Sequence, residues 1–75
     1  MDTALQTRLE AALKKRAPGA FHFSELYGEG WQRLYIGDRV KLGNAFLRLV
    51  RQGRFPGVED TGTKKGGGRL YRKTG

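Results

Sequence analysis

Basic and amide side chains recur at helical spacing between residues 38 and 52. At 100° per residue they share a sector of roughly 100°, opposite an apolar sector. Arg and Lys side chains pair with phosphates and guanine, and Asn and Gln pair with adenine. The sector holds no carboxylate, whereas a merely solvated helix face usually mixes charges of both signs. The pattern therefore predicts a surface that contacts a polyanion, formed by Lys41, Asn44, Arg48, Arg51 and Gln52.

A second group of cations lies in a glycine-rich segment nearer the carboxyl end. The stretch Thr61–Gly68 is polar, ends in three glycines and has no apolar anchor, which is typical of a projecting loop. We expect Lys64, Lys65 and the following Arg69 to contact phosphates or enter a minor groove. The alternative is that lysines at this turn only keep a sheet edge soluble. Arg39 is expected near the start of the basic helix, beside the same ligand.

Charge and missing residue types narrow the classes of function. Fifteen Lys and Arg against seven Asp and Glu give a formal net charge of +8, which attracts polyanions. The chain has no cysteine and one histidine, His22, which excludes disulfides and a four-ligand zinc site in practice. No nucleophile has a base at a useful spacing, and the three glycines lack the strand–loop–helix context of a phosphate-binding loop. We therefore predict a protein that is not an enzyme, with no metal, cofactor or small-molecule substrate.

Length and hydropathy predict one cytoplasmic domain over residues 1–75. A chain of 75 residues has no room for a second core. Its first stretch is charged throughout, unlike a signal peptide, and its longest apolar runs are two or three residues. No membrane partner is therefore expected. A monomer and a homodimer both stay open, since alanines in the first helix leave room for close helix approach.

The helices that position the cations follow from apolar periodicity. Leucines and alanines at i, i+4, i+7 and i+8 predict a first helix that stops before Pro18-Gly19. In the basic helix, Asp38 is the predicted N-cap and Gly53 the C-terminal glycine. Gly43 lies inside this helix and costs about 1 kcal/mol relative to alanine. Close packing against another helix is the expected reason for it.

Shorter elements fill the remaining sequence. Residues 20–23 carry aromatics at i and i+2, as in a short strand, and Ser24 is the expected N-cap of a second helix. Residues 55–60 and 70–72 are expected to pair as a hairpin around a mobile loop at 61–68, with a flexible tail at 73–75. The side chains expected in or near the core between the second and third helices are Trp31, Leu34, Tyr35 and Ile36.

The predicted order is therefore α-β-α-α-β-β. It is typical of a small α+β winged helix, in which a helix-turn-helix core is followed by a C-terminal β-hairpin called the wing. In such proteins the third helix enters the major groove of DNA.

An ordered set of apolar, aromatic and glycine positions runs through residues 21–72. It comprises Phe21-x-Phe23-x-x-Leu26, Trp31, Gly37-Asp38-Arg39-x-x-Leu42-Gly43-x-x-Phe46-x-x-x-Val50, Gly53 and Tyr71. In these positions the chain resembles a family of short bacterial and phage proteins of uncharacterised function. The positions are mostly core positions, so the resemblance implies a stand-alone winged-helix-like protein and no particular functional residue.

The leading hypothesis is a DNA-binding protein, such as a small transcriptional regulator, with its third helix in the major groove and its wing on phosphates. RNA is the first alternative, as in ribosome-associated proteins, although the aromatic-rich basic motif of RNA-recognition domains is missing. The second alternative is an adaptor or inhibitor that docks its basic face on an acidic protein partner.

Overall fold

Three α-helices and a three-stranded antiparallel sheet make up the computed structural model, which describes residues 2–66 and 68–74. The helices are α1 (Thr3–Lys15), α2 (Phe23–Tyr27) and α3 (Ile36–Arg51), and the 3-10 turn η1 (Trp31–Arg33) precedes α3. The strands are β1 (Gly19–His22), β2 (Val58–Lys64) and β3 (Arg69–Lys73). The predicted α+β class and element order are confirmed, with η1 as an addition.

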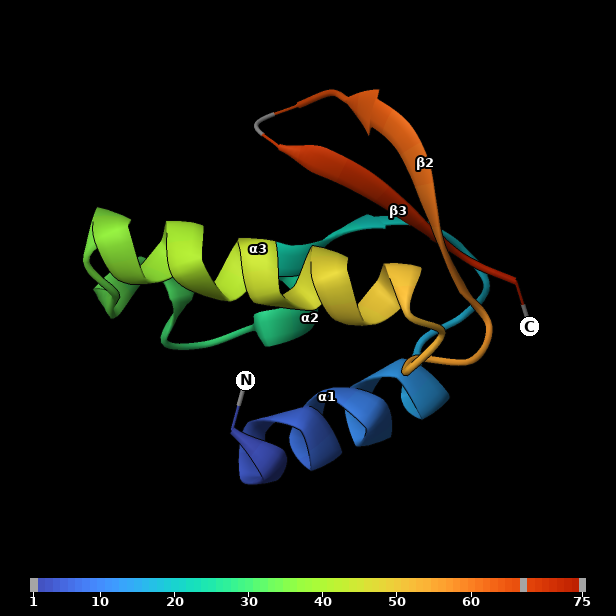
Figure 1. Ribbon diagram of the computed structural model, residues 1–75, viewed down its shortest axis with the longest axis horizontal. Coiled ribbons are helices and arrows are strands. Elements are labelled where there is room, and N and C mark those ends of the chain that lie inside the picture. Colours follow the sequence, from blue (N-terminus) through green and yellow to red (C-terminus); the bar gives the residue numbers. More distant parts are fainter. Residues whose placement is uncertain (1, 67, 75) are drawn as a thin grey trace.

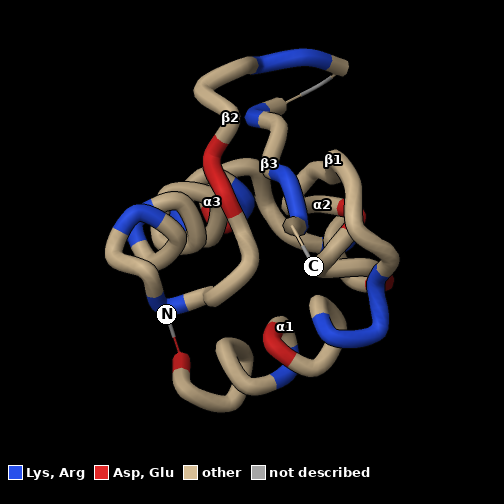
Figure 2. Tube along the Cα trace, turned by 90° about the vertical axis from the view of Figure 1, so that its right-hand side faces the viewer, with Lys and Arg blue, Asp and Glu red and all other residues tan. Residues whose placement is uncertain are grey.

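The sheet places β3 between β1 and β2, antiparallel to both. Helix α3 crosses the molecule with the hairpin β2–β3 on one side and α1 on the other (Figure 1). The tip of the hairpin projects beyond the helices (Figures 1 and 2). The consecutive elements α3 and β2–β3 thus lie side by side, with the hairpin tip extending past the helices.

Aromatic rings from several elements meet at Phe46 of α3, which is fully buried. Its ring centroid lies 4.6 Å from that of Phe23, 5.0 Å from Phe55 and 4.8 Å from Tyr71. Aromatic pairs of this kind stabilise a core beyond the effect of area burial alone. Phe46 therefore joins α3 to α2, to the segment before β2 and to the central strand.

The amino-terminal ends of α2 and α3 differ from the predicted caps. Helix α2 is capped by His22 rather than Ser24, and the His22 N–H donates to the Glu25 carboxylate at 2.9 Å. Helix α3 begins at Ile36, so Asp38 lies inside its first turn and is not the N-cap. A carboxylate in that turn still favours the positive end of the helix. Both helices begin earlier than predicted, at N-cap positions held by His22 and Tyr35, which are not among the residue types favoured there.

The carboxyl-terminal end of α3 confirms the predicted glycine. Gly53 has φ +75°, a left-handed conformation that glycine adopts without strain. Its N–H donates to the Val50 carbonyl at 3.0 Å, and the next N–H, of Arg54, donates to the Leu49 carbonyl at 2.9 Å. This pair of bonds is a Schellman motif, which satisfies carbonyls left open by the last turn.

The hairpin has a shorter turn than predicted, because β2 runs on to Lys64. Residues 61–64, expected in the loop, thus belong to the strand, and residues 55–57 precede it. The pairing with β3 is irregular between Asp60 and Lys64, where β2 carries extra residues. Side chains hold this bulge: the Thr61 hydroxyl donates to the Leu70 carbonyl at 2.7 Å, and the Gly62 N–H donates to Asp60 at 3.0 Å. Of the expected loop, residue 67 lies outside the described residues.

The expected flexible tail at 73–75 is also in part ordered. Lys73 belongs to β3, and its ammonium donates to the carbonyl of Arg16. The Thr74 N–H donates to the Gly57 carbonyl at 2.7 Å. Residue 75 lies outside the described residues. Residues 73 and 74 are therefore hydrogen-bonded to Arg16 after α1 and to Gly57 before β2.

Two residues expected near the core are exposed. Tyr35 is 83% exposed and Ile36 is 75% exposed, whereas Trp31 and Leu34 are half-buried as expected. The cause is the earlier start of α3, which carries its first turn to the end of the molecule (Figure 1). None of the described helices has the length and apolar character needed to cross a membrane.

Candidate nucleic-acid interface

The exposed side of α3 presents the predicted basic and amide side chains. Lys41, Asn44 and Arg48 are all exposed, and Asn44 and Arg48 lie one turn apart on the same face. Gln52 follows as the exposed C-cap. Within residues 2–66 and 68–74, none of the ion pairs involves Lys41 or Arg48. A ligand can therefore meet these two cations without displacing an internal carboxylate.

The hairpin supplies the second basic group. Lys64 ends β2 and Lys65 opens the turn; both are exposed, and neither forms an ion pair among the described residues. The Lys65 N–H donates to the Gly68 carbonyl at 2.9 Å, which closes the turn. Figure 2 shows a basic segment at the projecting tip and further basic positions on α3.

A cleft of about 390 Å³ separates α3 from the hairpin. Val40, Gly43, Asn44 and Leu47 line it from α3, and Lys64, Gly68 and Arg69 line it from the hairpin. The cleft thus brings together four of the predicted site residues: Arg39, Asn44, Lys64 and Arg69. The other five, Lys41, Arg48, Arg51, Gln52 and Lys65, lie outside its lining.

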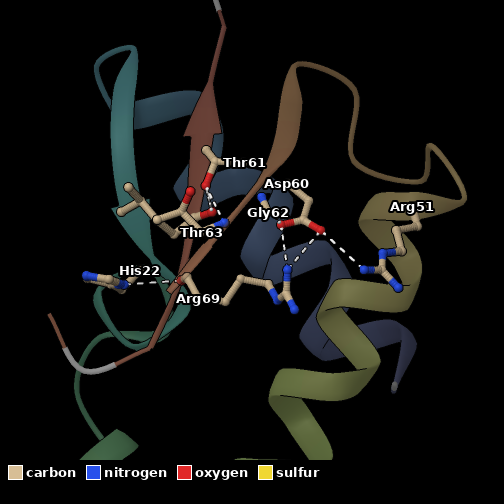
Figure 3. A network of polar contacts seen from close by, with 8 residues as sticks. His22, Arg51, Asp60, Thr61, Gly62, Thr63 and Arg69 are labelled. Carbon is tan, nitrogen blue, oxygen red and sulfur yellow. Dashed lines mark hydrogen bonds and ion pairs between the residues drawn. The ribbon is translucent and has the colours of Figure 1, made fainter. Parts of the chain in front are cut away.

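Arg51 and Arg69 share one carboxylate, that of Asp60 (Figure 3). Arg69 Nη1 donates to both Asp60 oxygens, at 3.0 and 3.2 Å, and Arg51 Nη2 lies 3.5 Å from Oδ2. The Gly62 N–H bond, and then the two arginines, lower the pKa of Asp60, while its partial burial opposes them. Asp60 therefore joins the hairpin to the last turns of α3 and neutralises part of their charge.

Asp60 was missed as a site residue by the sequence argument. The sequence does contain one indication of its role: Glu59 and Asp60 are the only acids after residue 38, so any acidic partner of the basic residues there from the same part of the chain is one of these two. Strand alternation points these two side chains to opposite faces of the sheet, so only one of them could meet the basic helix.

Replacing Asp60 with asparagine is expected to lower the free energy of unfolding at pH 7 by about 1.5–3 kcal/mol, because charged hydrogen bonds are lost. Since the folded-state pKa of Asp60 lies below its unfolded value of 3.8, this contribution is present above about pH 4 and is lost as pH falls further. Urea unfolding of wild type and variant at pH 7 measures the loss of stability, and the same experiment at pH 2–3 shows whether the difference disappears. Glu59→Gln is the matched control, with the same charge change and no such bonds. An Asp60→Asn effect equal to the control at pH 7 would contradict the assignment.

Arg39 is held by the backbone before α3. Its Nε donates to the Trp31 carbonyl at 3.0 Å, and its Nη2 donates to the Gln32 carbonyl at 2.9 Å. The guanidinium also lies 6.0 Å from the centre of the Trp31 ring, within cation–π range. Arg39 therefore fixes η1 to α3 at the border of the cleft. Its guanidinium also places a positive charge there.

His22 joins β1 to the hairpin and is half-buried. Its Nδ1 lies 3.2 Å from the Arg69 carbonyl, and because a carbonyl only accepts, Nδ1 is the donor. Tyr71, beside it in the cleft, is buried, and this burial raises the pKa of its hydroxyl to about 12. No three His, Asp or Glu side chains lie together as metal ligands in the described part of the chain.

The comparisons with known proteins place the chain in a family. Residues 7–73 match the family described as a domain of unknown function, DUF1413. No curated protein and no solved structure matches the chain. The matched range includes most of α1 and every later helix and strand, so the match extends over the whole fold. The predicted likeness to uncharacterised proteins is thereby confirmed at the level of the family, and the chain belongs to the DUF1413 family.

Proposed function

We propose that this protein binds nucleic acid, with duplex DNA as its ligand, through α3 and the hairpin β2–β3. One observation carries the proposal: exposed cations outside any described ion pair lie both on α3 and on the hairpin that follows it, and one of them, Lys64, lines the cleft between these elements. The exposed cations are Lys41 and Arg48 on α3 and Lys64 and Lys65 on the hairpin. A polyanion is the ligand that such a surface attracts.

The topology supports a winged-helix assignment, with α3 as the recognition helix and β2–β3 as the wing. The helix-turn-helix proteins that bind DNA place their third or second core helix in the major groove. An α-helix of about 10–12 Å in diameter fits a groove of about 12 Å. A non-enzymatic, cytoplasmic role such as transcription regulation agrees with this assignment and forms part of the proposal.

Base contacts would come from the row that Asn44 and Arg48 form on α3. Residues four apart in a helix are separated by about 6 Å along its axis, which is close to two base-pair steps. Asparagine pairs with adenine and arginine with guanine in the major groove. We therefore infer a preference for an adenine and a guanine about two steps apart, with the lysines contacting phosphates.

The salt dependence of binding tests the proposal. The three lysines assigned to phosphates, Lys41, Lys64 and Lys65, give an expected slope of about −2.7 for log affinity against log salt. Fluorescence anisotropy with a labelled random duplex, from about 50 to 200 mM salt, measures this slope. Affinity that is weak at low salt, or insensitive to salt, would overturn the proposal. Duplex RNA of equal length in the same titration separates DNA from the RNA alternative.

A protein partner is the second candidate, and one observation favours it. Tyr35, Ile36 and Val40 expose large apolar side chains next to the basic face of α3. Apolar groups rimmed by charge are typical of protein interaction sites. The double substitution Tyr35→Ser and Ile36→Ser should abolish capture of a partner from nuclease-treated lysate and leave duplex affinity within about twofold. Loss of duplex affinity alone would favour the DNA interface.

A further inference from the structure

Gly43 lies in the interior of α3, yet no contact among residues 2–66 and 68–74 requires a glycine there. A Cβ at this position would meet none of the described atoms within 4 Å beyond its own stretch of helix, so the close helix packing predicted for it is wrong. Its backbone is part of a continuous helix and shows no left-handed conformation. Alanine would stabilise the helix relative to glycine. Packing within the described chain therefore does not explain why residue 43 lacks a side chain, and a ligand that approaches the helix backbone would explain it.

The surroundings of Gly43 indicate what could approach it. Gly43 lines the cleft between α3 and the hairpin, with Val40 and Leu47 on the same side one turn before and after it. Lys64 and Arg69 are the basic residues of the opposite wall, and Arg69 is already paired with Asp60. The cleft thus has an apolar strip around an uncovered helix backbone, facing one exposed lysine that no described ion pair involves.

We propose that this cleft receives the sugar–phosphate backbone of one DNA strand, and that Gly43 lets the strand approach the backbone of α3. This inference rests on the proposed function. Deoxyribose presents apolar surface that suits Val40 and Leu47, whereas a phosphate suits the exposed ammonium of Lys64 on the opposite wall. A cleft of about 390 Å³ is also of the size that ligand sites occupy. With α3 in the major groove, the strand beside that groove passes between helix and hairpin.

Leucine at position 43 would fill the cleft without meeting any protein atom at its Cβ. Gly43→Leu is expected to lower duplex affinity at least about tenfold, equivalent to about 1.4 kcal/mol, while circular dichroism stays that of the wild type. Gly37→Leu is the matched control: Gly37 lies in the same helix, has nothing within 4 Å of a Cβ, and does not line the cleft. Its affinity should stay within about twofold of wild type.

Gly43→Ala separates stability from binding. The melting temperature should rise by about 4–8 °C, as expected when a helical glycine is replaced in open space in a domain of this size. Affinity for the duplex should nevertheless fall, by about two- to fivefold, because the methyl group keeps the strand away. A merely structural role for Gly43 would not produce opposite changes in the two quantities.

The outcomes distinguish the two proposals. If wild-type protein binds the duplex with the expected salt slope and Gly43→Leu binds equally well, the cleft is not the strand site, while the proposed function stands. If Gly37→Leu loses as much duplex affinity as Gly43→Leu, the proposed strand site in the cleft is also overturned. Leucine elsewhere on α3 would then obstruct binding equally. A wild-type protein that fails to bind DNA overturns both. If Gly43→Leu loses affinity for duplex RNA and keeps its affinity for duplex DNA, the strand in the cleft is RNA and the DNA proposal for the cleft is wrong.

Discussion

Phe46→Ala is expected to lower the free energy of unfolding by about 3–5 kcal/mol. The Phe46 ring is fully buried and contacts three other aromatic rings, so alanine leaves a cavity where α3, α2 and the sheet meet. For a chain of 75 residues, the whole stability is only about 4–11 kcal/mol. One substitution therefore removes a large fraction of it and brings part of the population to the unfolded state.

Urea unfolding followed by circular dichroism measures this loss. Ile36→Ala serves as the control, because Ile36 is in the same helix and is 75% exposed. Its change should stay within about 0.5 kcal/mol. A cost below about 1 kcal/mol for Phe46→Ala would mean that the neighbouring rings close over the space, contrary to the packing described above.

The double variant Lys41→Ala and Arg48→Ala is expected to bind duplex DNA about 100-fold more weakly than wild type at low salt. In the proposed complex Lys41 contacts a phosphate and Arg48 a guanine, so both losses lower affinity, while loss of the phosphate contact should reduce the salt slope by about one unit. Both side chains are exposed and lie outside the described ion pairs, so the fold should be unaffected. Anisotropy titrations at several salt concentrations give the affinity and the slope together.

The matched control removes two charges from the far side of the molecule. Lys14→Ala with Lys15→Ala changes the net charge equally, but both lysines belong to α1, on the other side of α3 from the hairpin (Figure 1). Its affinity should fall less than about threefold, through general electrostatic attraction alone. If the two double variants lose equal duplex affinity, net charge alone attracts the ligand and α3 is not the binding surface.

Local signals predicted local features correctly. The first helix and Gly53 followed from leucine spacing and from the one residue type that tolerates a left-handed cap. The predicted caps Ser24 and Asp38 were wrong, because the N-cap positions are held by His22 and Tyr35, residue types that cap preferences do not single out. Tyr35 makes no side-chain capping bond to the helix, so no cap chemistry marks the start of α3 in the sequence.

The site was predicted in composition but not in pairing. Lys41 and Arg48 are exposed as helical periodicity requires, whereas the shared partner of Arg51 and Arg69 depends on the bulge in β2. A strand irregularity of this kind has no periodic signature. Gly43 shows the reverse case: the sequence marked it as unusual, and only the geometry showed that the space beside it is open.

The carboxylate of Asp60 has a further consequence for the two arginines. It occupies the position of an anion before any ligand arrives, and its two hydrogen bonds hold the guanidinium of Arg69, whereas Arg51 is mostly exposed and only within ion-pair distance. Immobilising a long side chain on binding costs about 0.5–1.5 kcal/mol. For Arg69, at the cleft, much of that entropy has already been lost on folding. The hairpin thus presents Arg69 preorganised, and in the proposed complex a phosphate would have to compete with this internal acid.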